Sequence, residues 1–390
     1  MTTNQGIQNV LITGARAPVT LHLSRLFQKK GIKVFLADSI SYPISKASNS
    51  VSKFFLLPSP KFKYKDFVQR VNHIINTCNI DLIIPTCEET FYLSMAKDAI
   101  KCAVFTDNLS TLQLLHNKFE FITYANQKGL KTPFTITTDN PTRVQQAIKH
   151  LGINHLVLKP IYSRFSDHIL FVSKQDVLTD NSQLLHPGWI AQQHIEGSQF
   201  CSYSIAQKGK VLAHTVYKTE FTAGIGATVA FSHQHIPAIY TFVSTLVEKL
   251  GFTGQIAFDF IEDANGEFYP IECNPRATSG LHLFSEEIVD TIIGNIYEDS
   301  TVLTPLDNTK YAIKLALLIY GSSYWKSYKT YKKWNKTLFS HSDIVYDKQD
   351  KRPFYYQFYS MYKIWRASKK NQCSLLEQTT YDISWDGEVH

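Results

Sequence analysis

The stretch "GEFYPIECNPRATSG", residues 266–280, decides how the rest of the chain is interpreted. It is typical of a strand that runs into a loop, and it places Glu272, Asn274 and Arg276 at alternate positions. Alternate side chains of an extended strand share one face, so these three polar groups are predicted to lie side by side. A carboxylate, an amide and a guanidinium on one strand face require a chemical explanation.

The preceding stretch "GQIAFDFIEDAN" supplies a partner strand. Asn265-Gly266 is a strong signal for a hairpin with a two-residue type I′ loop, and this loop sets Asp259 opposite Glu272. Like charges that face each other destabilise a sheet. We therefore expect a cation such as Mg²⁺ between the two acids, because Mg²⁺ prefers oxygen ligands. A protonated acid or a neighbouring Lys or Arg would also relieve the repulsion.

Length and composition exclude several classes of protein. With 44% hydrophobic and 19% charged residues, the 390-residue chain can form a sizeable core, in roughly two to four structural units. No apolar stretch approaches the ~20 residues that span a bilayer, and the N-terminus lacks the pattern of a signal peptide. The six cysteines are scattered, which disfavours metal fingers and a disulfide framework. We expect a reduced, cytoplasmic, soluble protein.

The first 108 residues alternate strands and helices. Strands are predicted at 10–13, 33–37 and 82–84, with helices between them. This pattern predicts a Rossmann-like, doubly wound parallel sheet over residues 1–108. The turn "TGARAPVT" lacks the glycines of a dinucleotide-binding fingerprint, although Asp38 occupies the place of a ribose-binding acid. An NAD-dependent oxidoreductase is therefore a less favoured alternative.

Glu88 and Glu89 follow the strand at 82–84, at the carboxyl end where crevices open in such sheets. One of them could contact an amine substrate, or both could simply stabilise a helix N-terminus. Further along, residues 109–130 are predicted to be helical with Ser110 as the cap. β-Rich runs then predict hairpins and strands up to a helix that ends near Gly251.

Taken in order, these elements resemble the ATP-grasp superfamily of carboxylate–amine ligases. The hairpin "AFDFI…GEFYPIECNPR" resembles that family's metal-binding hairpin, "LVLKP" its phosphate-contacting strand, and "IAQQHIEGSQF" its hinge. The resemblance implies an α/β protein with a pre-ATP-grasp domain at 1–108 and an α+β ATP-grasp domain at 109–300. A lid subdomain would span about 120–190, and a small C-terminal extension would span 301–390.

The resemblance also implies roles for individual residues. The nucleotide would be bound by Lys118, Lys159, Gln192, Gln193, Ile195 and Gln199. The metal, Mg²⁺ or alternatively Mn²⁺, would be held by Asp259, Glu272 and Asn274. The residues acting on the transferred phosphoryl group would be Arg276, Lys159 and Arg164. Arg276 could instead form a salt bridge to one of the acids, and Arg164 could be an ordinary exposed arginine.

Two departures from the family pattern concern the nucleotide. The turn "YSRFSDH", residues 162–168, stands where many members have a glycine-rich loop over the phosphates, so Ser163, Arg164 and Ser166 would have to bind phosphate through side chains. Glutamine replaces the common acids at Gln193 and Gln199. These glutamines leave the base and sugar preference less defined.

Members of this family typically use ATP to activate a carboxylate as an acyl phosphate, releasing ADP. An amine, or a thiol, then attacks and phosphate leaves, which gives an amide-type C–N bond with an amine. The implied partners are ATP, a small-molecule carboxylate and an amine, with a homodimer as an option. The main alternative is a nucleotide-binding sensor or scaffold without catalysis.

Two loops are candidates for contact with substrate. The segment 218–231 contains Gly224 and Gly226 and would be either a mobile loop over the substrate or a plain turn. After Arg276, the side chain of Ser279 and the main chain of Gly280 would bind the carboxylate substrate.

The last quarter of the chain carries most of the net charge of +7, since 14 Lys and Arg accompany 8 Asp and Glu from residue 301 onward. On a helix, one apolar stripe forms from Phe354, Phe358, Met361 and Trp365. Three interpretations stay open: the stripe packs on the catalytic domain, makes peripheral contact with an anionic membrane, or lines a substrate or partner site. We expect no nucleic-acid partner, because the excess charge is confined to one segment.

Overall fold

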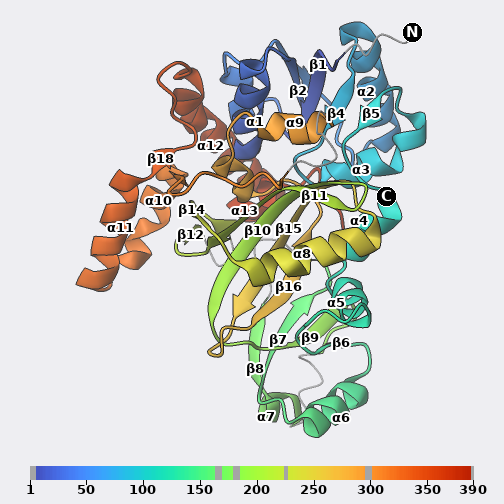
Figure 1. The fold of residues 1–390 in the computed structure, drawn as a ribbon, viewed down its shortest axis with the longest axis vertical. Coiled ribbons are helices and arrows are strands. Elements are labelled where there is room, and N and C mark those ends of the chain that lie inside the picture. Colours follow the sequence, from blue (N-terminus) through green and yellow to red (C-terminus); the bar gives the residue numbers. More distant parts are fainter. Residues whose placement is uncertain (1–5, 163–168, 179–184, 224–226, 295–300, 388–390) are drawn as a thin grey trace.

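The computed structural model describes residues 6–162, 169–178, 185–223, 227–294 and 301–387. The protein is mixed α/β, and its three larger sheets follow one another along the long axis of the molecule (Figure 1). The N-terminal five-stranded sheet lies at the top of that view, the seven-stranded sheet in the middle and the four-stranded sheet at the bottom. None of the helices in these ranges is long and apolar enough to cross a membrane.

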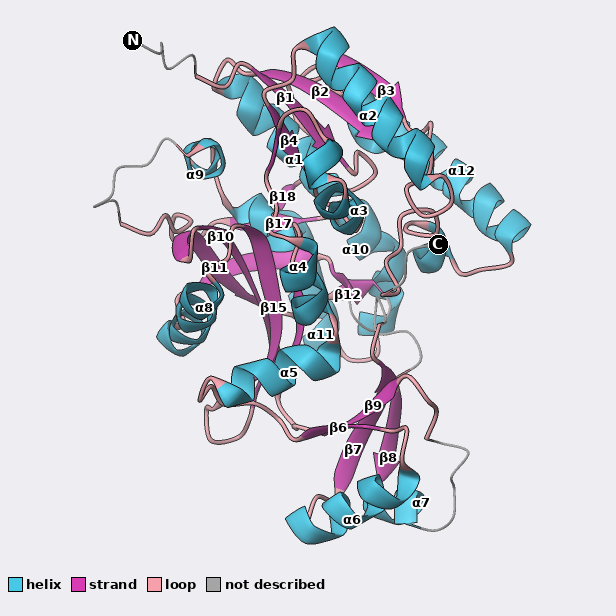
Figure 2. Ribbon diagram, turned by 90° about the vertical axis from the view of Figure 1, so that its right-hand side faces the viewer, coloured by secondary structure: helices cyan, strands magenta, loops and turns pink. Residues whose placement is uncertain are grey.

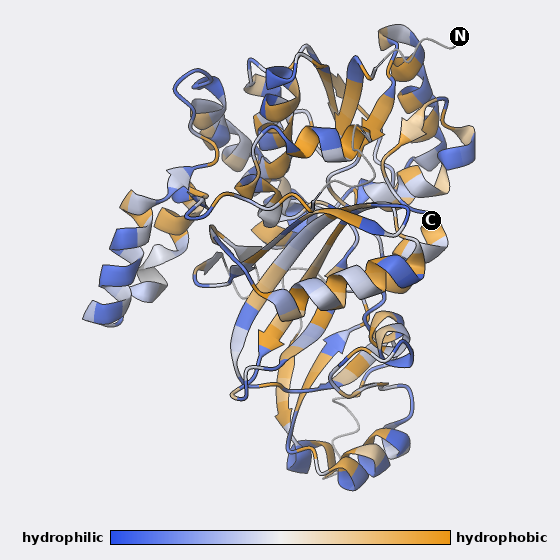
Figure 3. Ribbon diagram, in the orientation of Figure 1, coloured by the Kyte–Doolittle hydropathy of each residue, from blue (hydrophilic) through white to orange (hydrophobic). Residues whose placement is uncertain are grey.

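The N-terminal sheet is parallel throughout, in the strand order β3-β2-β1-β4-β5. Its elements are β1 (Asn9–Thr13), α1 (Pro18–Lys29), β2 (Lys33–Asp38), β3 (Lys53–Leu56), α2 (Tyr64–Cys78), β4 (Leu82–Ile84), α3 (Glu89–Met95) and β5 (Ala103–Val104). Val10 of β1 shares a core with Phe27 of α1. The next residue, Leu11, shares a different core with Phe67 of α2. Helices therefore cover both faces of these apolar strands, as predicted (Figure 3).

Two helices follow this unit along the chain, α4 (Leu109–His116) and α5 (Lys118–Gln127). The predicted cap at Ser110 is wrong, because Ser110 lies inside α4. The chain turns at Asn117 instead, whose side chain accepts hydrogen bonds from two main-chain N–H groups of the first turn of α5. This cap makes Lys118 the first residue of α5.

The four-stranded sheet is antiparallel, in the order β6-β9-β7-β8. Its elements are β6 (Thr135–Thr137), α6 (Pro141–Leu151), β7 (His155–Pro160), β8 (Leu170–Ser173), α7 (Lys174–Leu178) and β9 (Trp189–Gln193). Its apolar side chains form a cluster separate from the other cores. The sheet is thus a small packed unit of its own at one end of the molecule (Figures 1 and 2).

The seven-stranded sheet has the order β16-β15-β10-β11-β14-β17-β18. Its elements are β10 (Ser198–Gln207), β11 (Lys210–Lys218), β14 (Ala230–Gln234), α8 (Pro237–Leu250), β15 (Gly254–Glu262), β16 (Phe268–Asn274), β17 (Lys310–Ala312) and β18 (Ser342–Asp343). Phe242 of α8 packs against Phe258 and Phe260 of β15. Because α8 covers that face, Asp259 between the two phenylalanines projects from the opposite one.

The loop of the β15–β16 hairpin differs from the prediction. It has three residues, 264–266, because the main-chain N–H of Asp263 donates to the carbonyl of Glu267 at 2.9 Å. Gly266 takes the positive φ of 78° that the last position of such a loop favours. The predicted two-residue loop at Asn265-Gly266 is therefore wrong, and the longer loop alone would shift the pairing by one residue.

A bulge in β16 restores the pairing. Phe260 lies opposite Pro270, whereas Asp259 lies opposite Glu272, so Ile271 is the additional residue on β16. The predicted opposition of Asp259 and Glu272 is therefore confirmed. It results from two compensating irregularities, a longer loop and a bulge.

The C-terminal part contributes two strands of the seven-stranded sheet and four α-helices. These helices are α10 (Lys314–Tyr320), α11 (Tyr328–Ser340), α12 (Arg352–Asn371) and α13 (Leu375–Gln378). α12 lies at the edge of the molecule in both ribbon views (Figures 1 and 2). After α13 the chain passes back to the carboxyl ends of the N-terminal strands, where Thr379 and Asp382 contact Arg16.

The apolar stripe of α12 packs on the rest of the protein at its first residue, because Phe354 contacts a core cluster that contains Leu21, Ile344 and Val345. Phe358, Met361 and Trp365 are exposed, and Phe354 is half-buried. The buried residues of this helix are small or polar: Pro353, Gln357, Ser360 and Ser368. The interpretation that the stripe packs on the protein therefore holds for Phe354 and is wrong for the three exposed residues.

Candidate active site

Two facing carboxylates occupy the centre of the site. Desolvation, and then the charge of Glu272, raise the pKa of Asp259 above its ordinary value. For Glu272, desolvation acts in the same direction, but Lys118 and Lys159 outweigh it and lower the pKa. Asn274 Nδ2 also donates to Glu272 Oε1 at 3.1 Å. The free site thus holds a stable negative charge on Glu272 and a second acid that ionises readily only beside a cation.

Lys118 approaches the acids from α5. Its side chain is 4% exposed, and its Nζ lies 3.6 Å from Glu272 Oε2. The capped N-terminus of α5 fixes this approach, since Lys118 directly follows the capping residue Asn117. The ammonium group is therefore held against the hairpin by the main chain and by burial.

Lys159 approaches from the end of β7. Its Nζ donates to Gln192 Oε1 at 2.9 Å and to the main-chain carbonyl of Ile271 at 3.1 Å. Ile271 is the bulged residue of β16, so the irregularity that restores the hairpin register also provides an acceptor for this lysine. Burial, followed by the charge of Lys118, lowers the pKa of Lys159 to about 8.

Charges of each sign are thus crowded in one place, two ammonium groups beside two carboxylates. The like pairs repel each other, and each pair would be relieved by a bound group of opposite charge. A divalent cation between Asp259 and Glu272 and a polyanion beside Lys118 and Lys159 fit this arrangement, as a metal–phosphate complex would provide. No cluster of three or more His, Cys, Asp or Glu suited to a metal occurs among the described residues. Further oxygen ligands would have to come from Asn274, water or phosphate.

Gln192 and Gln193 lie next to each other at the end of β9, so their side chains point to opposite faces. Gln192 is buried, and its Nε2 donates to Thr135 Oγ1 at 3.0 Å while its Oε1 accepts from Lys159. Gln193 Oε1 accepts from the main-chain N–H of Phe134 at 3.4 Å. Of these two glutamines, it is therefore Gln192 that contacts Lys159.

Ile195 follows β9 in the hinge, and Gln199 lies in β10; both are half-buried. Cys201 of β10 lies opposite Asp259, and Gln199 precedes Cys201 by two residues. Gln199 is thus on the same face of the large sheet as the acids. The structure brings it toward the predicted site, at the end of the strand nearest the hinge.

Arg276 connects the hairpin to the N-terminal unit. Its Nη2 donates to Asn274 Oδ1 at 3.1 Å, and its Nε lies 3.8 Å from Glu88 Oε1. The other oxygen of Glu88 accepts from the main-chain N–H of Trp385 at 3.0 Å. The salt bridge of Arg276 is therefore to Glu88, rather than to Asp259 or Glu272.

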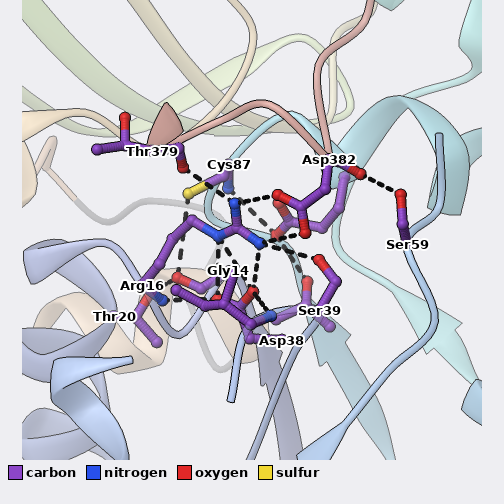
Figure 4. A network of polar contacts seen from close by, with 12 residues as sticks. Gly14, Arg16, Thr20, Asp38, Ser39, Ser59, Cys87, Thr379 and Asp382 are labelled. Carbon is purple, nitrogen blue, oxygen red and sulfur yellow. Dashed lines mark hydrogen bonds and ion pairs between the residues drawn. The ribbon is translucent and has the colours of Figure 1, made fainter. Parts of the chain in front are cut away.

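The C-terminal segment 379–387 occupies the crevice at the carboxyl ends of the N-terminal strands. The buried Arg16 guanidinium lies between Asp38 and Asp382 (Figure 4). The ion-pair distance is 2.6 Å to each of these acids. Trp385 stacks on Phe91 of α3, at 5.4 Å between ring centroids. Asp38 is consequently engaged by Arg16, which leaves no support for its predicted role as a ribose-binding acid.

Some predicted residues fall outside the part of the chain that the structure describes, and Glu89 has a structural role. Arg164 is outside the described residues, as are Gly224 and Gly226; the flanking strands β12 (Thr222–Ala223) and β13 (Ala227–Thr228) form a two-stranded ribbon. Glu89 caps its own turn, since its carboxylate accepts from Thr13 and from two main-chain N–H groups.

Gly280 is a packing residue. A Cβ on Gly280 would overlap Cβ of Tyr203, and the residue is buried against the large sheet. This packing explains why the position is glycine, and the predicted contact of its main chain with the carboxylate substrate stays untested. Ser279 next to it is half-buried, so its predicted contact with substrate stays untested.

A known protein family resembles this chain in sequence, and solved structures resemble it in fold. Residues 115–280 match an ATP-grasp domain. Among curated proteins, none shows significant sequence similarity to this chain.

Solved structures share the fold over most of the chain at low sequence identity. N5-carboxyaminoimidazole synthetase from Staphylococcus aureus superimposes with a TM-score of 0.62 and 13% identity, covering 82% of this chain and 86% of that one. The biotin carboxylase domain of the 2-oxoglutarate carboxylase of Hydrogenobacter thermophilus, described as a dimer with MgADP and bicarbonate, gives 0.61 and 14%, covering 79% and 74%. L-amino acid ligase from Bacillus licheniformis gives 0.55 and 18%, covering 71% and 69%.

Proposed function

We propose that this chain, which contains an ATP-grasp domain, is an ATP- and Mg²⁺-dependent ligase that activates a carboxylate as an acyl phosphate and joins it to an amine. The observation that carries the proposal is the convergence of Lys118 and Lys159 on the facing acids Asp259 and Glu272. These groups come from three separate elements, α5, β7 and the β15–β16 hairpin. The lysines offset the charge of Glu272, but the raised pKa of Asp259 indicates that the second acid lacks a compensating cation, which a bound metal would provide.

Each group has a distinct task in this proposal. Asp259, Glu272 and Asn274 would hold the metal, with Mn²⁺ as an alternative to Mg²⁺. The ATP complex supplies the phosphoryl group that turns the carboxylate into an acylating agent. Lys118 and Lys159 would bind its phosphates and neutralise charge that develops on the phosphoryl oxygens.

The nucleoside end of the ATP would lie along the hinge. Gln192, the main chain at Ile195 and Gln199 border that end of the site, and Gln193 faces away from it. Gln192 touches Lys159 directly, so we propose that it orients the ammonium group as well as lining the pocket. Arg164 remains proposed as a phosphate ligand.

Arg276 would act where the acyl phosphate forms. Its guanidinium is half-buried beside Asn274, a proposed metal ligand, and offers two N–H groups in a plane to phosphoryl or carboxylate oxygens. Glu88 opposite its Nε would keep the guanidinium directed at the site. Glu88 is therefore a positioning residue in this proposal, and the tail that contacts it forms one wall of the site.

The alternatives have less support. An NAD-dependent oxidoreductase would need Asp38 and the crevice beside Gly14, but Arg16 and the segment 379–387 occupy them. A non-catalytic sensor would not need both acids and both lysines. All four are present: Lys118 lies 3.6 Å from Glu272, Asp259 is opposite Glu272, and Lys159 interacts electrostatically with both acids.

The proposal extends to the organisation of the chain. We propose the division into 1–108, 109–300 and 301–390 as a working description, and a dimer by analogy with the biotin carboxylase domain. All six cysteines are free, which is the state expected in the cytoplasm.

A screen for ADP release tests the function. Purified protein with ATP and Mg²⁺ is mixed with a panel of carboxylic acids crossed with amines, and products are identified by mass spectrometry. We expect one class of pairs to raise ADP release and to give a product with the mass of acid plus amine minus water. ATP binding without ADP release from any pair would favour the sensor alternative.

A further inference from the structure

α12 is amphipathic, but most of its large apolar side chains face away from the protein, unlike those of an ordinary surface helix. The fully buried residues of its face toward the protein are small or polar, led by Gln357 and Ser360, with Phe354 and Ile364 half-buried beside them. Its outward face carries the large apolar and aromatic residues, each 42–66% exposed: Tyr355, Phe358, Tyr359, Met361, Tyr362 and Trp365. A surface helix normally turns its apolar stripe to the core. The outward stripe of α12 therefore suits a second apolar environment outside the protein.

The outward residues form a continuous line. Tyr355, Phe358, Tyr362, Trp365 and Lys369 follow the spacing i, i+3, i+7, i+10 and i+14, which keeps them on one side of an α-helix. The ring centroids of Tyr362 and Trp365 are 6.2 Å apart, with an angle of 30° between the ring planes. The helix has 20 residues, so it is about 30 Å long, and the aromatic part covers about half of it.

The charge of α12 has one sign. It contains five basic residues and no Asp or Glu: Arg352, Lys363, Arg366, Lys369 and Lys370. Within the described part of the chain, none of these five takes part in an ion pair. Lys363 lies over the ring of Tyr359 and Arg366 over that of Tyr362, so cations border the aromatic line. A partner of this face must accept aromatic rings and also bear negative charge.

We propose that the outward face of α12 docks on an anionic lipid bilayer. Tyr and Trp rings with a polar edge suit the headgroup level of a bilayer, and flanking Lys and Arg suit anionic lipid headgroups. A second copy of the same face is disfavoured, because five positive charges would meet five others without any acid. Single-stranded nucleic acid is usually held in a groove, whereas the aromatic line here is on the convex side of one helix.

Vesicle sedimentation with the full chain tests the proposal. Vesicles of phosphatidylcholine with about 30% phosphatidylserine are compared with pure phosphatidylcholine vesicles at low and high salt. We expect binding to the anionic vesicles that weakens as salt rises. Equal binding to both compositions, or no binding to either, would overturn the proposal.

Two sets of variants separate the contribution of the aromatic residues to vesicle binding from that of the basic residues. Phe358→Ser with Tyr362→Ser and Trp365→Ser should lower the partition coefficient at least about tenfold. Arg366→Gln with Lys369→Gln and Lys370→Gln should lower it by roughly 100-fold, from about one kcal/mol for each basic residue. Because all these side chains project outward, the thermal midpoint should stay unchanged.

A matched control is Phe62→Ser with Phe171→Ser, two aromatic residues that are exposed elsewhere on the protein. This control should bind vesicles like the wild type. An equal loss in the control would show a non-specific effect of surface hydrophobicity and overturn the proposal. Competition by single-stranded oligonucleotide at lower concentration than by anionic vesicles would assign the face to nucleic acid and also overturn it.

A spectroscopic readout locates the contact. Lipids brominated near the headgroup should quench part of the tryptophan fluorescence when the protein is bound. This part should disappear in Trp365→Phe, with vesicle binding largely kept. Quenching that is unchanged in Trp365→Phe would place the contact elsewhere and contradict the proposal.

Discussion

Asp259 lies directly opposite Glu272 although the loop that joins their strands is one residue longer than the sequence predicts. The bulge at Ile271 compensates for the longer loop and offers its carbonyl to Lys159. The same irregularity thus aligns the acids and binds one of the lysines. Two carboxylates brought together in this way reduce the stability of the free protein, and that cost provides the first test of the site.

Removal of one acid should therefore stabilise the free protein and abolish turnover. For Asp259→Asn we expect a thermal midpoint equal to or above that of the wild type without Mg²⁺, and a loss of at least about 100-fold in ADP formation. Calorimetry and the ADP assay measure the two effects. Glu267→Gln on the same hairpin is the control, since the side chain of Glu267 is 55% exposed.

The pH dependence of this stabilisation has a definite sign. Because the pKa of Asp259 is raised in the folded state, the folded protein binds the proton more tightly than the unfolded chain. The wild type should lose stability relative to Asp259→Asn as the pH rises above the ordinary Asp value of 3.8, and Mg²⁺ should reduce the difference. A difference that is independent of pH would show that burial and Glu272 do not raise the pKa of Asp259.

Lys159 should take up a proton when ATP binds above pH 8. Its pKa of about 8 in the free protein reflects burial and then Lys118, and a bound polyphosphate would raise it again. Calorimetric titrations of ATP at pH 8.5, in buffers of different ionisation enthalpy, measure this uptake. Lys159→Met should abolish it and weaken ATP binding, whereas the exposed Lys29→Met should change neither.

The same lysine should influence stability in alkali. Since the folded pKa of Lys159 lies below the ordinary Lys value of 10.5, the free energy of unfolding should rise between about pH 8 and 10.5 by up to about 3 kcal/mol. Denaturant titrations of the wild type and Lys159→Met across this range isolate the effect. Parallel curves for the two proteins would contradict the assigned burial.

The C-terminal tail should be essential for stability. Trp385 is 2% exposed and packs on Phe91 and Tyr92, so Trp385→Ala should cost about 3–5 kcal/mol in the free energy of unfolding. Trp385→Phe should cost less, because it keeps an aromatic ring and the main-chain contact to Glu88. The exposed Trp325→Ala is the control and should be close to neutral. An equally small effect of Trp385→Ala would show that the tail is not held in the crevice.

A substitution at Gly280 distinguishes a role of this residue in packing from a role in substrate binding. Gly280→Ala places a methyl group on Tyr203, so we expect a loss of roughly 1–3 kcal/mol of stability. Chemical denaturation measures it, with Gly6→Ala as the control because open space surrounds that position. An unchanged stability with a raised KM for the carboxylate would instead support the original expectation of substrate binding.

Local sequence patterns predict correctly which face of the hairpin each residue occupies. The alternation of Glu272, Asn274 and Arg276, and the apolar neighbours of Asp259, determine which face each residue occupies. The parallel N-terminal sheet follows from its strand and helix periods in the same way. Loop length was not determined locally, because a bulge elsewhere in the hairpin can compensate for it.

Contacts between residues that are far apart in the sequence could not be predicted from it. Nothing near Trp385 indicates that its main-chain N–H meets Glu88, a residue 297 positions earlier. The salt bridge of Arg276 to Glu88 depends on the same tertiary arrangement. For α12 the helical period was predicted correctly, but a period does not tell which environment the apolar face meets.

The most direct test of carboxylate activation follows the carboxylate oxygens. Each acid of the panel is supplied with ¹⁸O in its carboxyl group together with ATP, Mg²⁺ and the amine, and the released phosphate is analysed by mass spectrometry. Attack of a carboxylate oxygen on the phosphoryl group predicts phosphate that carries one ¹⁸O atom, with ADP as the other product. Turnover that gives only unlabelled phosphate, or AMP and pyrophosphate, would contradict the account.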